Sequence, residues 1–188
     1  MSATLTRLYL IRAITALTWA VLLFVALAQA GTLTAGSAVP AFATALLVLY
    51  PVIDVAASVV DARAQQASGR PGNARTQWIN AAISTVTAVA VLVAALDGPA
   101  PVLRVYAAWA ILTGVIQLAL AVNRLRRGLP GQWSMIISGA GSALVGLTFV
   151  NQATQPELSL TGVAGYAVGG AILYLISTAR LRRTAITA

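Results

Sequence analysis

Apolar residues along this chain fall into six long stretches, which short polar or charged segments separate. The stretches cover residues 8–30, 39–60, 77–96, 101–122, 132–150 and 160–179. Each holds at least about 18 mostly apolar residues, which at about 1.5 Å of rise per residue can cross a hydrocarbon core about 30 Å thick. A run such as 81–96 does not alternate apolar with polar positions, as a barrel strand would. The pattern predicts an all-α, polytopic membrane bundle of six transmembrane helices.

The six stretches use nearly the whole chain, so we expect a single domain over residues 1–188. Turn-forming residues separate them, for example Gly98 with Pro99 after the third stretch and Pro156 after the fifth. The start of the chain, with Arg7 and Arg12 before an apolar run, is also similar to a cleavable secretory signal. Because the run leads directly into further spans, we expect an uncleaved first helix.

Charges are distributed very unevenly between the two sides of these spans. The side with most arginines holds Arg7, Arg12, Arg63, Arg70, Arg75, Arg124, Arg126, Arg127, Arg180, Arg182 and Arg183. The segments on the other side hold Asp97 and Glu157. Short basic loops stay in the cytoplasm, which predicts that the N- and C-termini are both cytoplasmic. The use of Arg without Lys, with abundant Ala, favours a bacterial cytoplasmic (plasma) membrane protein.

Composition narrows the classes of function further. Apolar residues make up 59% of the chain and charged residues 9%, with a mean hydropathy of +0.86. The net charge of +8 comes from short interhelical segments, which favours a lipid bilayer over nucleic acid as the partner. The chain contains neither Cys nor His, the usual ligands of zinc and haem and the commonest general base. We therefore predict no catalytic residues, no metal site, no cofactor and no enzymatic activity.

Parts of the sequence recur. Residues 115–126 are similar to residues 171–182, 56 positions later, and both end in Arg-Leu-Arg. The third and fifth spans open alike, with Gln-Trp at 77–78 and at 132–133. These similarities predict three tandem helical hairpins with the same orientation. The alternative is that apolar helices ending in arginine are alike by composition alone.

The hairpins place Gly114 and Gly170 two residues before Ile116 and Ile172, and each is followed by an arginine-rich exit. With the residues at 109–114, 132–133, 138–139 and 166–172, this pattern resembles the HdeD-like short-repeat membrane proteins of bacteria. The first half of the chain matches in topology, with Pro51 in the second span where the later repeats have glycine. The resemblance implies six spans, a cytoplasmic membrane and, in some members, a link to acid or stress resistance.

Asp54 is the carboxylate placed deepest in a predicted span, about 10 Å from Asp61 at the arginine-rich end. A carboxylate at this depth costs several kcal/mol unless it faces a cation, a cavity or the protein interior. One interpretation is a proton or cation site. The other is a buried ion pair, for which Arg12, entering from the same side, is the expected partner.

Three other polar residues are candidates. Asn80 and Gln117 share the depth of Asp54, with Gln117 at its repeat position, and could line a pocket with it or form interhelical hydrogen bonds. Arg104 alone lies toward the side with few arginines. It could reach the surface, pair with Asp97 or Glu157, or form an anion site.

Small residues recur every fourth position in spans 5 and 6 and predict close helix packing, either within the monomer or in a homo-oligomer. The residues are Ser138, Ser142, Gly146, Gly165 and Gly169. The polar segment 61–76 is the expected contact for a protein partner. We also expect an interfacial belt of Tyr9, Trp78 and Trp133, and core positions for Trp19, Tyr50 and Trp109.

These features favour a non-enzymatic integral membrane protein of HdeD-like type with a stress-related, accessory or structural role. The alternative is a small transporter or channel that uses Asp54 as an intramembrane proton or cation site.

Overall fold

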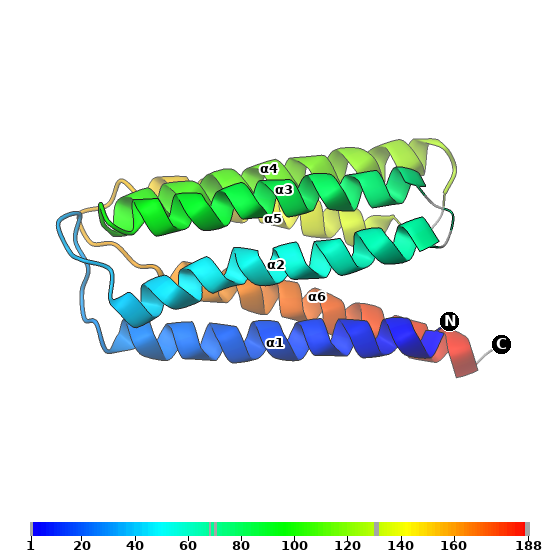
Figure 1. The fold of residues 1–188 in the computed structure, drawn as a ribbon, viewed down its shortest axis with the longest axis horizontal. Coiled ribbons are helices and arrows are strands. Elements are labelled where there is room, and N and C mark those ends of the chain that lie inside the picture. The colour runs from blue at the N-terminus through cyan, green and yellow to red at the C-terminus, as the bar shows by residue number, and fades with distance from the viewer. Residues whose placement is uncertain (1, 68, 70, 130–131, 187–188) are drawn as a thin grey trace.

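A computed structural model describes residues 2–67, 69, 71–129 and 132–186 as a bundle of six α-helices (Figure 1). The helices are α1 (Ser2–Ala28), α2 (Ala41–Ala67), α3 (Pro71–Ala94), α4 (Pro99–Arg126), α5 (Trp133–Gln152) and α6 (Thr161–Ile186). All six contain segments long and apolar enough to cross a membrane. The predicted all-α membrane bundle of six spans is therefore confirmed, and the protein is an integral membrane protein.

The helices run up and down in chain order, so that both termini lie at one end of the bundle (Figure 1). We call this the terminal end, and the other the opposite end. At the opposite end the loop after α1 meets the loop before α6, where the Leu158 amide donates a 2.8 Å hydrogen bond to the Leu33 carbonyl. Leu33 and Leu158 are both buried, so this contact fixes the opposite end of the bundle.

The closest helix pairs differ from the three hairpins that the repeat suggests. α2 packs most extensively on α3, α4 on α5, and α1 on α6, all antiparallel, whereas α1–α2, α3–α4 and α5–α6 meet less closely. The tightest pairs within the chain are thus joined at the terminal end, and the first helix packs on the last. Small side chains explain this choice, because helices approach where side chains leave room.

Glycines bring α4 and α5 into backbone contact. A Cβ atom placed on Gly114 would lie 2.6 Å from the Gly139 carbonyl oxygen, and one on Gly139 would lie 2.8 Å from the Gly114 oxygen. One turn further along, the Ser142 hydroxyl donates a 2.9 Å hydrogen bond to the Ala110 carbonyl. The small-residue face of the fifth span therefore closes the monomer. In α6, by contrast, Gly165 and Gly169 are exposed, with open space around both.

Aromatic side chains fill the centre of the bundle. Trp19 stacks on Tyr50 with ring centroids 4.3 Å apart, and Tyr50 meets Trp109 edge to face at 5.8 Å. Trp19 and Trp109 are 3% and 7% exposed, which confirms their predicted core positions. Trp133 lies exposed at the start of α5 and Trp78 lies exposed about two turns into α3, both toward the terminal end, where an interfacial belt would place them.

The polar segment 61–76 is mostly helical, which differs from the long loop that its composition suggests. α2 continues to Ala67 and α3 begins at Pro71, with Gly69 at φ +68° between them. Ala, Arg and Gln after Asp61 are good helix formers, so α2 extends past the apolar stretch. Proline suits the first position of a helix, where its missing N–H leaves no bond unmade.

Candidate functional site

Asp54 lies in a hydrogen-bonded cluster formed by α2, α3 and α4. Its Oδ2 atom accepts hydrogen bonds from Asn80 Nδ2 at 2.8 Å and Ser84 Oγ at 2.7 Å. The same Asn80 nitrogen donates to Ser58 Oγ at 2.8 Å, and Trp109 Nε1 donates to Ser84 Oγ at 3.2 Å. We call these five residues the Asp54 cluster. The predicted proximity of Asp54 and Asn80 is confirmed.

Helical spacing explains how the cluster forms. Asp54 and Ser58 lie four residues apart on α2, and Asn80 and Ser84 lie four residues apart on α3, so each pair occupies one helix face. The close antiparallel contact of α2 and α3 turns these two faces toward each other. Ser58 and Ser84 are buried at 2% and 0% exposure, while Asp54 is half-buried. Polar side chains at this depth must form hydrogen bonds with neighbouring side chains, because a buried polar group without a partner costs free energy.

The cation expected beside Asp54 is bound elsewhere. Arg12 Nη2 lies 2.7 Å from Asp61 Oδ2, so Arg12 forms its ion pair with Asp61. Long side chains on a helix lean toward its N-terminus, which for α1 is the terminal end. Arg12 therefore reaches Asp61, near that end, and Asp54 leans the other way along α2. The expected Arg12–Asp54 pair is wrong, and Asp54 lacks a cationic partner within the described part of the chain.

Arg12 connects three helices near the terminal end. Besides Asp61 on α2, it contacts Tyr174 on α6, whose hydroxyl accepts from Nη1 at 3.1 Å. The guanidinium carbon also lies 5.6 Å from the Tyr174 ring centroid, within range of a cation–π interaction. The Arg12 and Asp61 side chains are 20% and 23% exposed, so solvent screens the pair in part. The contact ties α1 to α2 where they otherwise meet loosely.

Gln117 does not join the Asp54 cluster: within the described residues, none of the cluster's hydrogen bonds involves it. The residue of α4 that reaches the level of Asp54 is Trp109, through Ser84. Gln117 lies eight residues further along the helix, or about 12 Å toward the terminal end. Gln117 therefore lies nearer the terminal end than the residue of α4 that reaches the cluster, which differs from its expected place beside Asp54.

Arg104 lies exposed on α4, near the opposite end. In the described part of the chain it forms no ion pair with Asp97 or Glu157. Of the three expectations for this residue, the geometry agrees with a side chain that reaches the membrane surface.

A proline lies one turn from Asp54 on the side of the opposite end. Pro51 is buried inside α2 and has no N–H to donate to the Leu47 carbonyl, four residues earlier. The Tyr106 hydroxyl of α4 donates to that carbonyl at 2.6 Å, and Trp19 Nε1 donates to the neighbouring Leu46 carbonyl at 2.6 Å. Two buried aromatic donors thus satisfy backbone groups beside the proline, as a bundle in lipid requires.

Beyond this proline, the interior is apolar toward the opposite end. The large fully buried side chains of the described residues include Leu23, Leu47, Val91 and Leu103, all in the main core cluster. The buried Thr87 on α3 donates within its own helix, to Ile83 at 2.9 Å. The charged side chains that interact with Asp54, Arg12 and Asp61, therefore lie toward the terminal end, whereas the polar groups toward the opposite end are neutral.

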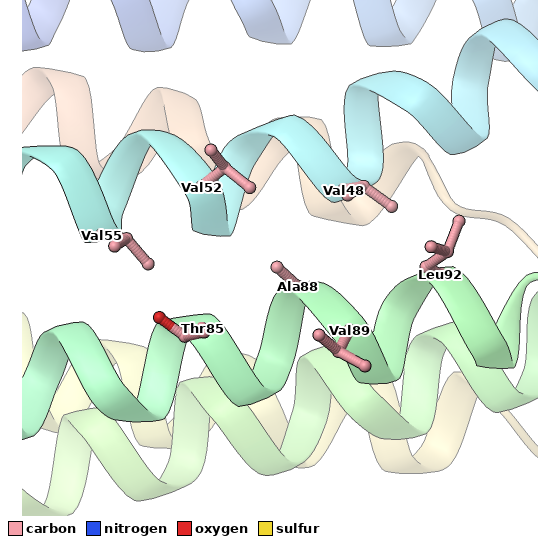
Figure 2. Close-up of a pocket in the computed structure, with 7 residues that line it drawn as sticks. All are labelled: Val48, Val52, Val55, Thr85, Ala88, Val89 and Leu92. Carbon is pink, nitrogen blue, oxygen red and sulfur yellow. The ribbon is translucent and has the colours of Figure 1, made fainter.

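Two shallow grooves on the surface of the described residues lie beside α3. One, of about 350 Å³, lies between α2 and α3 and is lined by Val48, Val52, Val55, Thr85, Ala88, Val89 and Leu92 (Figure 2). The other, of about 570 Å³, follows α3 toward Asp97 and Pro101. Neither lining includes a member of the Asp54 cluster. Both grooves are apolar and face outward, where a membrane supplies acyl chains.

Comparison with known proteins identifies no relative: no protein-family model, no curated protein and no solved structure matches this chain. Within the described residues, no three His, Cys, Asp or Glu side chains gather as a metal site would require. The Asp54 cluster is the candidate site that the geometry provides. Sequence reasoning found Asp54, Asn80 and Arg12 and missed Ser58, Ser84 and Trp109. The signal for the two serines was their four-residue spacing from Asp54 and Asn80.

Proposed function

We propose that this protein is a non-enzymatic membrane protein of HdeD-like type with a stress-related accessory role, and that its Asp54 cluster binds one positive charge. The observation that carries the proposal is the charge balance. Arg12 and Asp61 neutralise each other, and Asp54 is left with neutral neighbours. An isolated charge inside a membrane protein is costly, so it is neutralised by a bound partner. A proton or a monovalent cation supplies that charge.

The direction of access follows from the distribution of polar groups. Asp54, Ser58 and Asp61 lie on one face of α2, with spacings of four and three residues, and lead from the terminal end to the cluster. The apolar core closes the opposite side. Polar side chains that lead to the site from one side only favour binding and sensing over passage across the membrane. This is why we place the accessory role before a transporter or channel with Asp54 as its coupling site.

We further propose that the terminal end faces the cytoplasm of a bacterial cell. Most arginines occupy this end of the helices, as the positive-inside rule requires. The helical segments around Gly69 and the exposed Gly165–Gly169 face of α6 are the proposed contacts for a protein partner and for a second copy of the chain. The chain has no cysteine, so single cysteines can be labelled uniquely. A membrane-impermeant maleimide applied to intact cells should label Ala35→Cys and spare Gln66→Cys; the reverse pattern contradicts the orientation.

Flux through proteoliposomes separates the accessory role from transport. With an imposed pH or Na⁺ gradient, we expect vesicles with wild-type protein and with Asp54→Asn to leak no faster than protein-free vesicles. The physical reason is the apolar core between Asp54 and the opposite end. A sustained wild-type flux that Asp54→Asn abolishes, with the variant folded, contradicts the accessory role and supports the transporter.

A further inference from the structure

We infer that the ligand of the Asp54 cluster is a monovalent metal cation of the Na⁺ or K⁺ class, an inference that rests on the positive-charge site proposed above. The cluster brings oxygen atoms of three side chains close together. Asp54 Oδ2 is 2.7 Å from Ser84 Oγ, and the Asn80 amide nitrogen is 2.8 Å from both Asp54 Oδ2 and Ser58 Oγ. Carboxylate, hydroxyl and amide oxygens are the ligands that hard cations prefer.

The directions of the hydrogen bonds favour a metal cation over a proton. Trp109 Nε1 can only donate, so Ser84 Oγ accepts from it and gives its own hydrogen to Asp54. The Asn80 amide likewise uses its hydrogens on Asp54 and Ser58. Asp54 Oδ2 therefore accepts two hydrogen bonds, and hydrogen bonds donated to a carboxylate favour its ionised form. A carboxylate kept ionised needs a positive charge other than its own proton.

The charge of the site selects a monovalent ion. Among the described residues, the charged and titratable groups that interact with Asp54 are Arg12 from α1, Tyr50 and Asp61 from α2, and Tyr166 from α6. With Arg12 paired to Asp61, one negative charge remains, which one monovalent cation neutralises and a divalent cation would exceed. The two ends of the Asn80 amide have nearly the same shape. A half-turn of the amide presents its oxygen to the cation in place of the nitrogen.

Oxygen atoms also line the approach from the terminal end. Asp61 lies seven residues from Asp54 on the same face of α2, and Gln65 lies four residues beyond it. The Gln65 Oε1 atom is buried and accepts no hydrogen bond from the described residues. Ser58, between Asp61 and Asp54, is buried and already faces Asn80. From Gln65 to Asp54, an oxygen-bearing side chain thus recurs at each turn of α2, with Asp61 also paired to Arg12.

Thermal unfolding of the full-length protein in a neutral detergent tests the inference. The probe is NaCl or KCl, exchanged against choline chloride at constant ionic strength and pH. We expect Na⁺ or K⁺ to raise the unfolding temperature of the wild type with saturation, because a ligand of the folded state at 100 times its Kd raises the folded-to-unfolded ratio about 100-fold. Asp54→Asn should remove this response. Asp97→Asn, which removes an exposed carboxylate near the opposite end, should retain it.

Ser58→Ala provides a second variant, which keeps the Asp54 charge and removes one oxygen. We expect it to fold and to need a cation concentration about tenfold higher for the same response, the equivalent of one lost ligand. A wild type that responds to Na⁺ and K⁺ no more than to choline overturns the cation. If its stability then depends on pH through Asp54, the site takes a proton and the proposed function stands. If Asp54→Asn changes neither the salt nor the pH response, both proposals fail.

Discussion

Replacing Gly139 with alanine should separate α4 from α5 and cost the protein about 1–3 kcal/mol or more of unfolding free energy, the range for overpacked sites. The new Cβ atom would lie 2.8 Å from both the Gly114 oxygen and the Leu118 nitrogen. These are backbone atoms, which cannot rotate away as the end of a flexible side chain can. Gly114→Ala meets the Gly139 oxygen at 2.6 Å and should be equally severe.

Gly141→Ala is the matched control for this effect. Gly141 lies in α5 two residues from Gly139, and a Cβ atom there meets nothing within 4 Å. Alanine is favoured over glycine inside a helix by up to about 1 kcal/mol, so this variant should be neutral or slightly stabilised. Unfolding in mixed micelles with an anionic detergent measures all three variants. Equal stabilities for Gly139→Ala and Gly141→Ala would show that the two helices do not touch at these glycines.

Removing the Tyr106 hydroxyl should cost about 1–3 kcal/mol, the penalty for leaving a buried acceptor without a partner. Tyr106 is fully buried, and its hydroxyl donates at 2.6 Å to the carbonyl that Pro51 leaves free. In Pro51→Ala the alanine N–H can donate to the Leu47 carbonyl within α2. Tyr106→Phe should then cost much less than it does beside the proline.

A double-mutant cycle of these two substitutions gives the coupling between proline and tyrosine directly. The cycle compares the effect of Tyr106→Phe on the unfolding free energy in the wild type and in Pro51→Ala. The same hydroxyl is removed in both backgrounds, so the difference between the two effects reports the coupling. We expect a coupling of about 1 kcal/mol or more. If Tyr106→Phe lowers the unfolding free energy equally in both backgrounds, the Tyr106 hydroxyl does not satisfy the Leu47 carbonyl that Pro51 leaves without its helical donor.

The six spans could be predicted from the sequence because a segment in lipid must be apolar and must satisfy its own backbone hydrogen bonds along its whole length. A helix that continues beyond the apolar stretch has no such signal, so the polar composition of segment 61–76 favours a loop where α2 in fact continues to Ala67 and α3 begins at Pro71. Contacts between helices depend on features that composition does not show. The pairing of α4 with α5 follows from the Gly114–Gly139 contact, although repeat similarity indicated other partners.

The same difference applies to the candidate site. Asp54 and Asn80 could be recognised because polar residues at membrane depth are rare and must satisfy each other. The partner of Arg12 could not be identified from depth alone, since the lean of its side chain along α1 selects Asp61. Gln117 was assigned through a repeat whose register the packing does not follow. The role of Trp109 could not be predicted, because a tryptophan deep in a span is usually only a core residue. In the structure it is a core residue and also donates a hydrogen bond to Ser84.

The stability of Asp54→Asn tests the central claim, that Asp54 has no cationic partner among the residues that the structure describes. Asparagine has nearly the shape of aspartate, and its oxygen can still accept from Asn80 and Ser84. In choline buffer at neutral pH, where no metal cation neutralises Asp54, we predict that the unfolding free energy of Asp54→Asn equals or exceeds that of the wild type. A loss of about 3–5 kcal/mol, the cost of breaking a buried ion pair, would contradict this account.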